Sequence, residues 1–190
     1  MSKVQLSGNA NGTGIFTIAS PNSNTDRTLT LPDSTGTVMT TATAIALSQL
    51  PAGSVVQVVQ DTFSTSYSSS TGSDVLTRQV SITPTSASNK ILIISSLMCR
   101  TTQNTAGSDA FIYIKVYRGT SSGTLLINGY PVVGGRDTDQ RGVFSSNYLD
   151  SPATTSSVTY SYYINSAYAT SVELNSTTSP SMITLMEIKA

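Results

Sequence analysis

The run ILIISSLMC at residues 91–99 decides the fold of this 190-residue chain. Side chains of a β-strand alternate between its two faces, and in this run both faces are apolar. We therefore expect residues 91–99 to form a central strand. The run ends at Cys99, the only cysteine of the chain, so no intrachain disulfide can form. We expect Cys99 to be a small buried core residue, with an intermolecular disulfide or a reactive thiol as the alternative.

Further strand-like segments lie on both sides of this run and are separated by turn signals. We expect them at residues 55–63, 76–82, 110–118, 125–133, 143–149, 158–164, 172–174 and 182–188. Eight or nine strands in about 135 residues, with no helix between them, are typical of an all-β protein with an antiparallel β-sandwich. A jelly roll is the first topology that we predict. The break at Pro51 to Gly53 places this domain at residues 54–190.

The composition agrees with an all-β protein whose surface is polar through hydroxyl groups. Charged residues make up 11% of the chain, with ten basic and ten acidic residues. Ser and Thr supply roughly a third, far above the usual share of a globular domain. A net charge of zero argues against nucleic-acid binding. We also expect a soluble chain without signal peptide or membrane insertion, because no apolar stretch approaches the roughly 20 residues of a membrane helix.

Before the sandwich, residues 12–38 read as two short alternating strands joined by a polar connection. Phe16 and Ile18 share one face of the first strand, and Leu29 and Leu31 share one face of the second. Four such side chains cannot stabilise an isolated hairpin in water. The segment must therefore be disordered alone or ordered by assembly, and its regular pattern favours assembly.

Residues 40–50, TTATAIALSQL, form the only plausible helix, which the following Pro51 and Gly53 would end. A helix of this length is marginal in isolation, and an extended linker is the alternative. We therefore assign residues 1–50 to an N-terminal segment that is separate from the sandwich and is ordered by assembly.

Two parts of the sequence resemble tail-fibre and fibre-like virion proteins of bacteriophages, particularly marine and cyanobacterial ones. The first is the N-terminal segment, with GTG at 12–14, FTI at 16–18, TLTLPD at 28–33 and TGT at 35–37. The second comprises YLDSPATTS at 148–156, which leads into VTY at 158–160, and the final MITLMEI at 182–188. The resemblance implies a homotrimer whose N-terminus docks on other virion proteins, in a tail, baseplate or capsid platform, and whose C-terminal domain projects outward.

Catalytic constellations are missing from the sequence. It contains no histidine, which removes Ser-His-Asp and Cys-His nucleophile activation and histidine metal ligands. Cys99 has neither a partner cysteine nor a histidine, so the ligands of a zinc site are lacking. We predict that the chain is not an enzyme and needs no cofactor or metal.

The densest charged cluster lies in the loop 134–142, which contains Arg136, Asp137, Asp139 and Arg141. An Asp-x-Asp pair could bind calcium or act on a glycosidic bond, but the further oxygen ligands of a calcium loop are not arranged here. We expect a solvated hairpin tip with local Arg–Asp pairing. Contact with a host receptor is the alternative.

Tyrosines gather toward the end of the chain, and their positions divide them into two groups. Tyr160 and Tyr162 share the face of Val158 and Ile164, which favours packing in the core or between subunits. Tyr163 has the opposite parity, and Tyr168 falls in a turn. These last two are the better candidates for exposure and for receptor contact.

The sequence as a whole predicts a structural component of a bacteriophage virion, most simply a short trimeric tail fibre that contacts a host surface glycan or protein. A capsid decoration or head-fibre protein is the nearest alternative. A free carbohydrate-binding module is an alternative of another class, and a depolymerase tailspike is a third, which the missing carboxylate architecture disfavours.

Overall fold

The computed structural model describes residues 7–8, 10–15, 17–19, 21–28, 30, 33, 35, 45–102, 111–129, 140–167, 171–175 and 180–190. The chain divides into two compact units, residues 1–42 and residues 43–190. The described residues of the first unit form neither strand nor helix, and all are exposed. The two strands predicted in 12–38 are thus absent from the described part of the single chain, where Ile15 and Ile18 are 93% and 75% exposed. Phe16, Leu29 and Leu31 lie outside the described residues.

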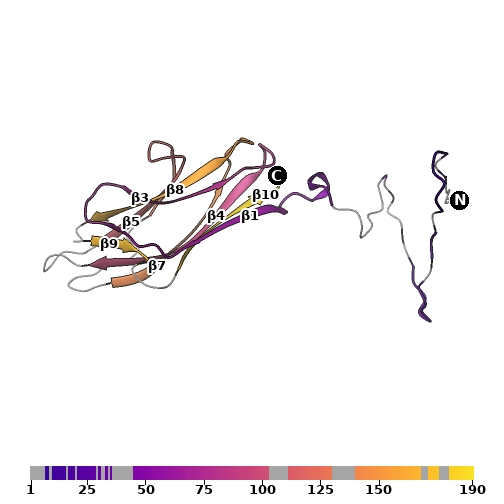
Figure 1. Ribbon diagram of the computed structural model, residues 1–190, viewed down its shortest axis with the longest axis horizontal. Coiled ribbons are helices and arrows are strands. Elements are labelled where there is room, and N and C mark those ends of the chain that lie inside the picture. Colours follow the sequence, from indigo (N-terminus) through magenta and orange to yellow (C-terminus); the bar gives the residue numbers. More distant parts are fainter. Residues whose placement is uncertain are drawn as a thin grey trace. The chain divides into compact units, whose positions relative to one another are not determined.

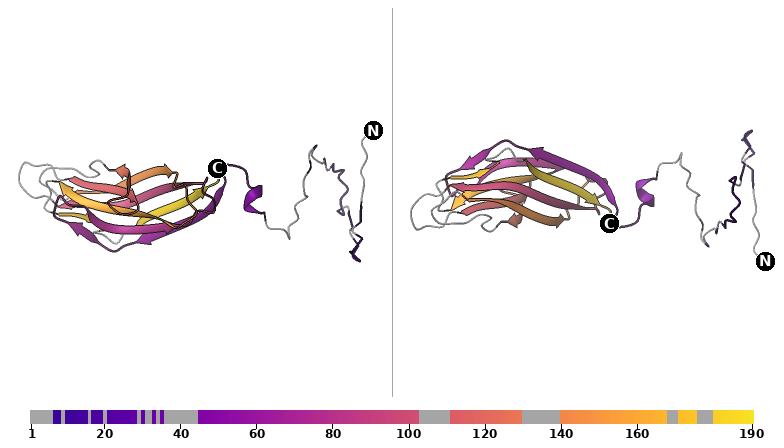
Figure 2. Two further views of the ribbon diagram at one scale, coloured as in Figure 1. Left: turned by 90° about the horizontal axis from the view of Figure 1, so that it is seen from above. Right: turned by 90° about the horizontal axis from the view of Figure 1, so that it is seen from below.

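The second unit is an antiparallel β-sandwich, which confirms the predicted fold class (Figure 1). Its strands are β1 (Val55–Phe63), β2 (Tyr67–Ser69), β3 (Val75–Ile82), β4 (Lys90–Thr102), β5 (Phe111–Arg118), β6 (Thr124–Asn128), β7 (Gln140–Asp150), β8 (Val158–Ala167), β9 (Ser171–Leu174) and β10 (Ser181–Ile188). Figure 2 shows these strands running side by side along the length of the sandwich.

The strand order is that of a jelly roll. Sheet I contains β1-β10-β4 with β7 on the other edge of β4, and sheet II contains β3-β8-β5-β6. The eight main strands, counted along the chain, thus run 1-8-3-6 in one sheet and 2-7-4-5 in the other, as two Greek keys require. The short strands β2 and β9 extend sheet I, because β9 pairs with residues 99–102 of β4, beyond the residues that pair with β10.

The core lies between the two sheets, and β4 is its central strand as predicted. Ile91, Ile93 and Leu97 of β4 are completely buried, and Cys99 is 3% exposed. The tyrosines predicted to face inward do so: Tyr160 and Tyr162 of β8 are 0% and 1% exposed.

At one end of the sandwich, the incoming chain is fastened to the last strand. The only helix among the described residues is the 3-10 turn η1 (Leu47–Gln49), so the helix predicted at 40–50 is reduced to this turn within its described part. The Nζ of Lys189 donates hydrogen bonds to the carbonyls of Leu47, at 2.9 Å, Ser48, at 3.1 Å, and Leu50. In a longer α-helix these carbonyls would accept hydrogen bonds from backbone N–H groups four residues later, and here Lys189 takes their place. No described helix is long and apolar enough to cross a membrane.

Candidate interaction site

The chain that enters β1, which we call the linker, and residues 140–142, the described part of the predicted receptor loop, lie at opposite ends of the sandwich. The register of β4 establishes this, because Lys90 pairs with Ile188, beside the linker, whereas Thr101 pairs with Gln140 at the end of the loop 134–142. The two ends of β4 are roughly 35 Å apart at the usual rise of a strand. We call them the linker end and the far end.

A row of charged residues crosses sheet I at the far end. Arg100 of β4 stands between Glu173 of β9 and Arg141 of β7 in the register, and its guanidinium lies 3.1 Å from the Glu173 carboxylate. Arg141, predicted in the loop, is instead an exposed residue of β7. The other predicted residues of this loop, Arg136, Asp137 and Asp139, lie outside the described residues.

Tyr163 is not exposed, contrary to the prediction. It lies on the outer side of sheet II, as its parity requires, but it is only 7% exposed. The backbone N–H of Ser121 donates a 3.0 Å hydrogen bond to its hydroxyl, and the ring of Tyr117 packs against it edge to face, 5.6 Å away. The turn between β5 and β6 thus covers Tyr163 and removes it from the candidate receptor contacts. Tyr168 lies outside the described residues.

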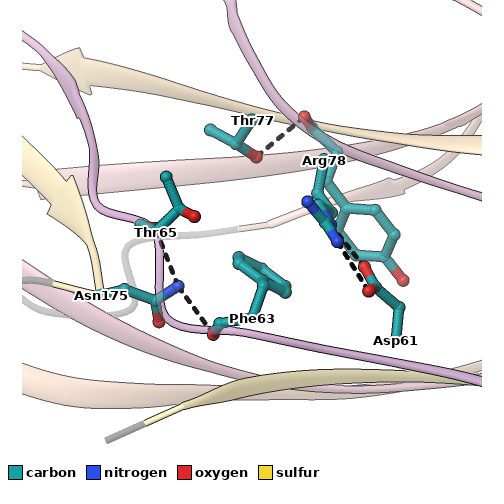
Figure 3. Close-up of polar contacts among 7 residues, drawn as sticks. Asp61, Phe63, Thr65, Thr77, Arg78 and Asn175 are labelled. Atoms are coloured by element: carbon teal, nitrogen blue, oxygen red, sulfur yellow. Dashed lines mark hydrogen bonds and ion pairs between the residues drawn. The ribbon is translucent and has the colours of Figure 1, made fainter. Parts of the chain in front are cut away.

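The two sheets are joined at one open edge by an ion pair that the sequence analysis did not identify (Figure 3). The guanidinium of Arg78, in β3, binds both carboxylate oxygens of Asp61, in β1, with its Nη2 2.7 Å from Oδ1. Arg78 also lies over the ring of Phe63, 5.0 Å from its centroid. The hydrogen bonds that Arg78 donates to Asp61 raise the pKa of Arg78, against the opposing effect of burial. The guanidinium of Arg78 therefore stays charged at all ordinary pH values.

Beside this ion pair lies a pocket of about 200 Å³, lined by Tyr67, Leu76, Thr77, Arg78 and Gln79. It offers one aromatic ring, one guanidinium and one amide on a polar wall. Such a wall can bind hydroxyl groups through paired donors and acceptors, with the aromatic ring packing against an apolar face. Among the residues that the structure describes, no three acidic or cysteine side chains form a group that could hold a metal ion. The pocket therefore has the groups that bind a polar ligand.

Near the same edge of the sandwich, Asn175 holds the chain where β1 ends (Figure 3). Its Nδ2 donates to the carbonyls of Phe63, at 3.2 Å, and Thr65, at 3.1 Å, where the chain leaves β1 for β2. Its Oδ1 accepts a hydrogen bond from the hydroxyl of Ser181. Asn175 has a φ of 55°, in the left-handed region that asparagine tolerates better than most residues. One buried side chain therefore fixes the corner between β1 and β2.

A second buried polar group lies at the linker end. The carboxylate of Glu187 is completely buried and accepts hydrogen bonds from the Nε2 of Gln57, at 2.6 Å, the Nδ2 of Asn89, at 2.7 Å, and the N–H and hydroxyl of Thr85, at 2.7 and 2.8 Å. Burial alone would raise the pKa of Glu187, but these hydrogen bonds outweigh it and lower the pKa. All the donors are neutral. The arrangement anchors the turn between β3 and β4 to β10.

One signal in the sequence could have identified both polar groups. Asp61 occupies the same face of β1 as Val59 and Phe63, and Glu187 occupies the same face of β10 as Ile183 and Leu185. A carboxylate on the apolar face of a strand needs a partner inside the fold. The identity of that partner depends on the pairing of distant strands, which the sequence does not show.

No protein-family model matches the chain, and no curated protein matches its sequence. Solved structures of the VP2 protein of infectious bursal disease virus align with it. A subviral particle of VP2 aligns with a TM-score of 0.39 and 14% identity over 72% of this chain and 38% of that chain. Derived T=1 particles align with a TM-score of 0.38 and 13% identity over 72% of this chain and 37% of that chain. The Gx strain aligns with a TM-score of 0.37 and 14% identity over 70% of this chain and 37% of that chain. The chain thus spans little more than a third of the length of these proteins.

Proposed function

We propose that this chain is a structural component of a bacteriophage virion, a short trimeric tail fibre without enzymatic activity. Residues 1–50 dock on another virion protein, and the jelly roll points its far end toward the host surface. The observation that carries the proposal is the exposure of Ile15 and Ile18 in the described part of the N-terminal segment. Apolar side chains in a regular pattern need partners, and identical copies or a platform protein supply them.

The end of the sandwich at which the linker joins supports this arrangement. The linker joins at the end marked by Lys90 and Lys189, so an anchored N-terminus leaves the far end, with Arg100, Arg141 and Glu173, turned away from the particle. Weak contacts at that end, repeated in three copies per fibre and in many fibres, give avidity without one strong site.

Two measurements test the proposal. Labelling the protein on intact particles, followed by cryo-electron microscopy, should locate it at the tail with three copies per fibre. A position on the capsid would instead identify a decoration or head-fibre protein. Sedimentation of the full chain at micromolar concentration should give a trimer, and a monomer would contradict the proposal.

A second candidate function, glycan binding, is favoured by the pocket beside Tyr67 and Arg78. The full chain would be tested on a glycan array, together with Tyr67→Ala and with Tyr113→Ala as the control on the other sheet. Loss of a glycan signal in Tyr67→Ala alone would assign binding to the pocket. The absence of any signal in the unaltered chain would exclude a carbohydrate-binding module.

A further inference from the structure

The outer face of sheet I has an unusual composition for a surface exposed to water. The register aligns its outward side chains in rows that cross the strands. The first row is Val58, Met186, Leu92 and Leu149; the second is Gln60, Thr184, Ile94 and Asn147; the third is Thr62, Met182, Ser96 and Ser145; the fourth is Met98 and Val143. No residue of these four rows carries a charge.

Much of this face lies open in the single chain. Val58, Val143 and Leu149 are 54%, 52% and 49% exposed, and Met182 and Ile94 are 42% and 39% exposed. These five exposed apolar side chains lie on one face of a single sheet, and exposed apolar surface of this kind marks an interaction site. β4 is apolar on both faces, which is typical of strands that are covered on both sides, yet the sandwich covers only one.

We propose that three copies of this chain turn this face toward a common threefold axis that runs along the strands. The inference rests on the trimer proposed above and names the surface through which the sandwiches meet. An axis along the strands brings each row to the height of the same row in the other copies. Apolar side chains then meet in the first and fourth rows, and the hydroxyl and amide groups of the middle rows can hydrogen-bond with one another.

The charges at the borders of the face agree with this choice of partner. Lys90 lies beyond the first row, and Arg100, paired with Glu173, lies beyond the fourth. Burial of the rows between them therefore traps no unpaired charge. A nucleic acid or a strongly charged protein would find no complementary group in these rows, whereas another copy presents an equally charge-free face. Since all strands run along the axis, the three linkers would leave from the same end.

The first test uses Ile94→Lys in the full chain, with Leu125→Lys of β6 as the matched control. Both residues are exposed to a similar degree, at 39% and 45%, and they lie on opposite sheets. A lysine in the middle of the buried face should weaken trimer formation at least a hundredfold in analytical ultracentrifugation, because it leaves an unpaired charge in the interface. Leu125→Lys should sediment like the unaltered chain, and both should melt cooperatively.

The second test does not perturb the fold. Ser96→Cys places a thiol in the middle of the face, and Ser81→Cys places one on the outside of sheet II. Mild oxidation should give at least tenfold more disulfide-linked dimer with Ser96→Cys, because the native Cys99 is buried and does not compete. Equal cross-linking of the two variants, or a trimer that survives Ile94→Lys, would overturn the assigned face and leave the trimeric fibre standing. An unaltered chain that sediments as a monomer would instead overturn the fibre itself.

Discussion

Asn89 and Glu187 are joined by a 2.7 Å hydrogen bond from the Asn89 amide to a completely buried carboxylate. Asn89 belongs to the turn before β4, and Glu187 belongs to β10, so the bond joins two strands of sheet I through their ends. The same carboxylate binds Thr85 and Gln57, and the four neutral donors take the place of a counter-ion. A charged group in the core is thereby kept ionised.

This carboxylate should make the stability of the sandwich depend on pH. The hydrogen bonds lower the pKa of Glu187 below its unfolded value of about 4.3, so its contribution is complete above that pH. It should be lost as the pH falls through the folded pKa. Chemical denaturation between pH 3 and pH 7 should show this loss, and Glu187→Gln should flatten it and cost about 1–3 kcal/mol at pH 7. Glu173→Gln, which breaks a partly exposed ion pair, should cost less than about 1 kcal/mol.

Replacement of Asn175 should destabilise the corner between β1 and β2. Asn175→Ala leaves the carbonyls of Phe63 and Thr65 without their donor and places alanine at a φ of 55°. We expect a loss of about 2–4 kcal/mol in the free energy of unfolding. Asn175→Gly removes the same hydrogen bonds, but glycine adopts a positive φ without strain. It should therefore be about 1 kcal/mol more stable than Asn175→Ala. Equal stabilities of the two variants would show that the backbone contributes nothing here.

Cys99 should react only in the unfolded chain. Burial raises the pKa of its thiol to about 12, which leaves about one thiolate in ten thousand at pH 8. A colorimetric thiol reagent should therefore modify Cys99 at the rate of unfolding in buffer and within seconds in concentrated urea. Rapid modification of a chain that retains its native circular dichroism would contradict the buried position.

The turn between β5 and β6 should not tolerate a side chain at residue 123. A Cβ at Gly123 would lie 2.1 Å from the carbonyl oxygen of Arg118, which is backbone and cannot move aside. Gly123→Ala should cost about 1–3 kcal/mol and loosen the cover over Tyr163. The nearest atom to a Cβ at Gly72 is 3.9 Å away, so Gly72→Ala should change stability by less than about 1 kcal/mol. Thermal unfolding of both variants compares them directly, and equal losses would refute the steric explanation.

The sequence predicted the main strands and the all-β fold because most strands alternate between apolar and polar residues and the central one is apolar on both faces. The run 55–63 became β1 without a shift of boundaries, and the run 91–99 became the middle of β4. β2 was missed because Tyr67–Ser69 is surrounded by serine and threonine and has no alternating pattern. It becomes a strand only because β9 lies beside it.

The candidate site was harder to predict, because its parts meet through pairing between distant strands. The parity of Tyr163 correctly placed it on the outer side of sheet II, but parity cannot show that the turn at Ser121 returns to cover it. Asp61 and Arg78 are 17 residues apart, and only the stacking of β1 over β3 brings them together. Local patterns thus predict which face a side chain occupies, and the tertiary fold determines what lies over it.

The junction at Lys189 has a mechanical consequence. The linker enters β1 at the end where β10 finishes, so a pull between the linker and the far end acts along both strands. Such a load acts parallel to the two strands, so all the hydrogen bonds between β1 and β10 share it. A domain tethered in this way should resist a steady drag far better than one whose first strand could be unzipped from its end.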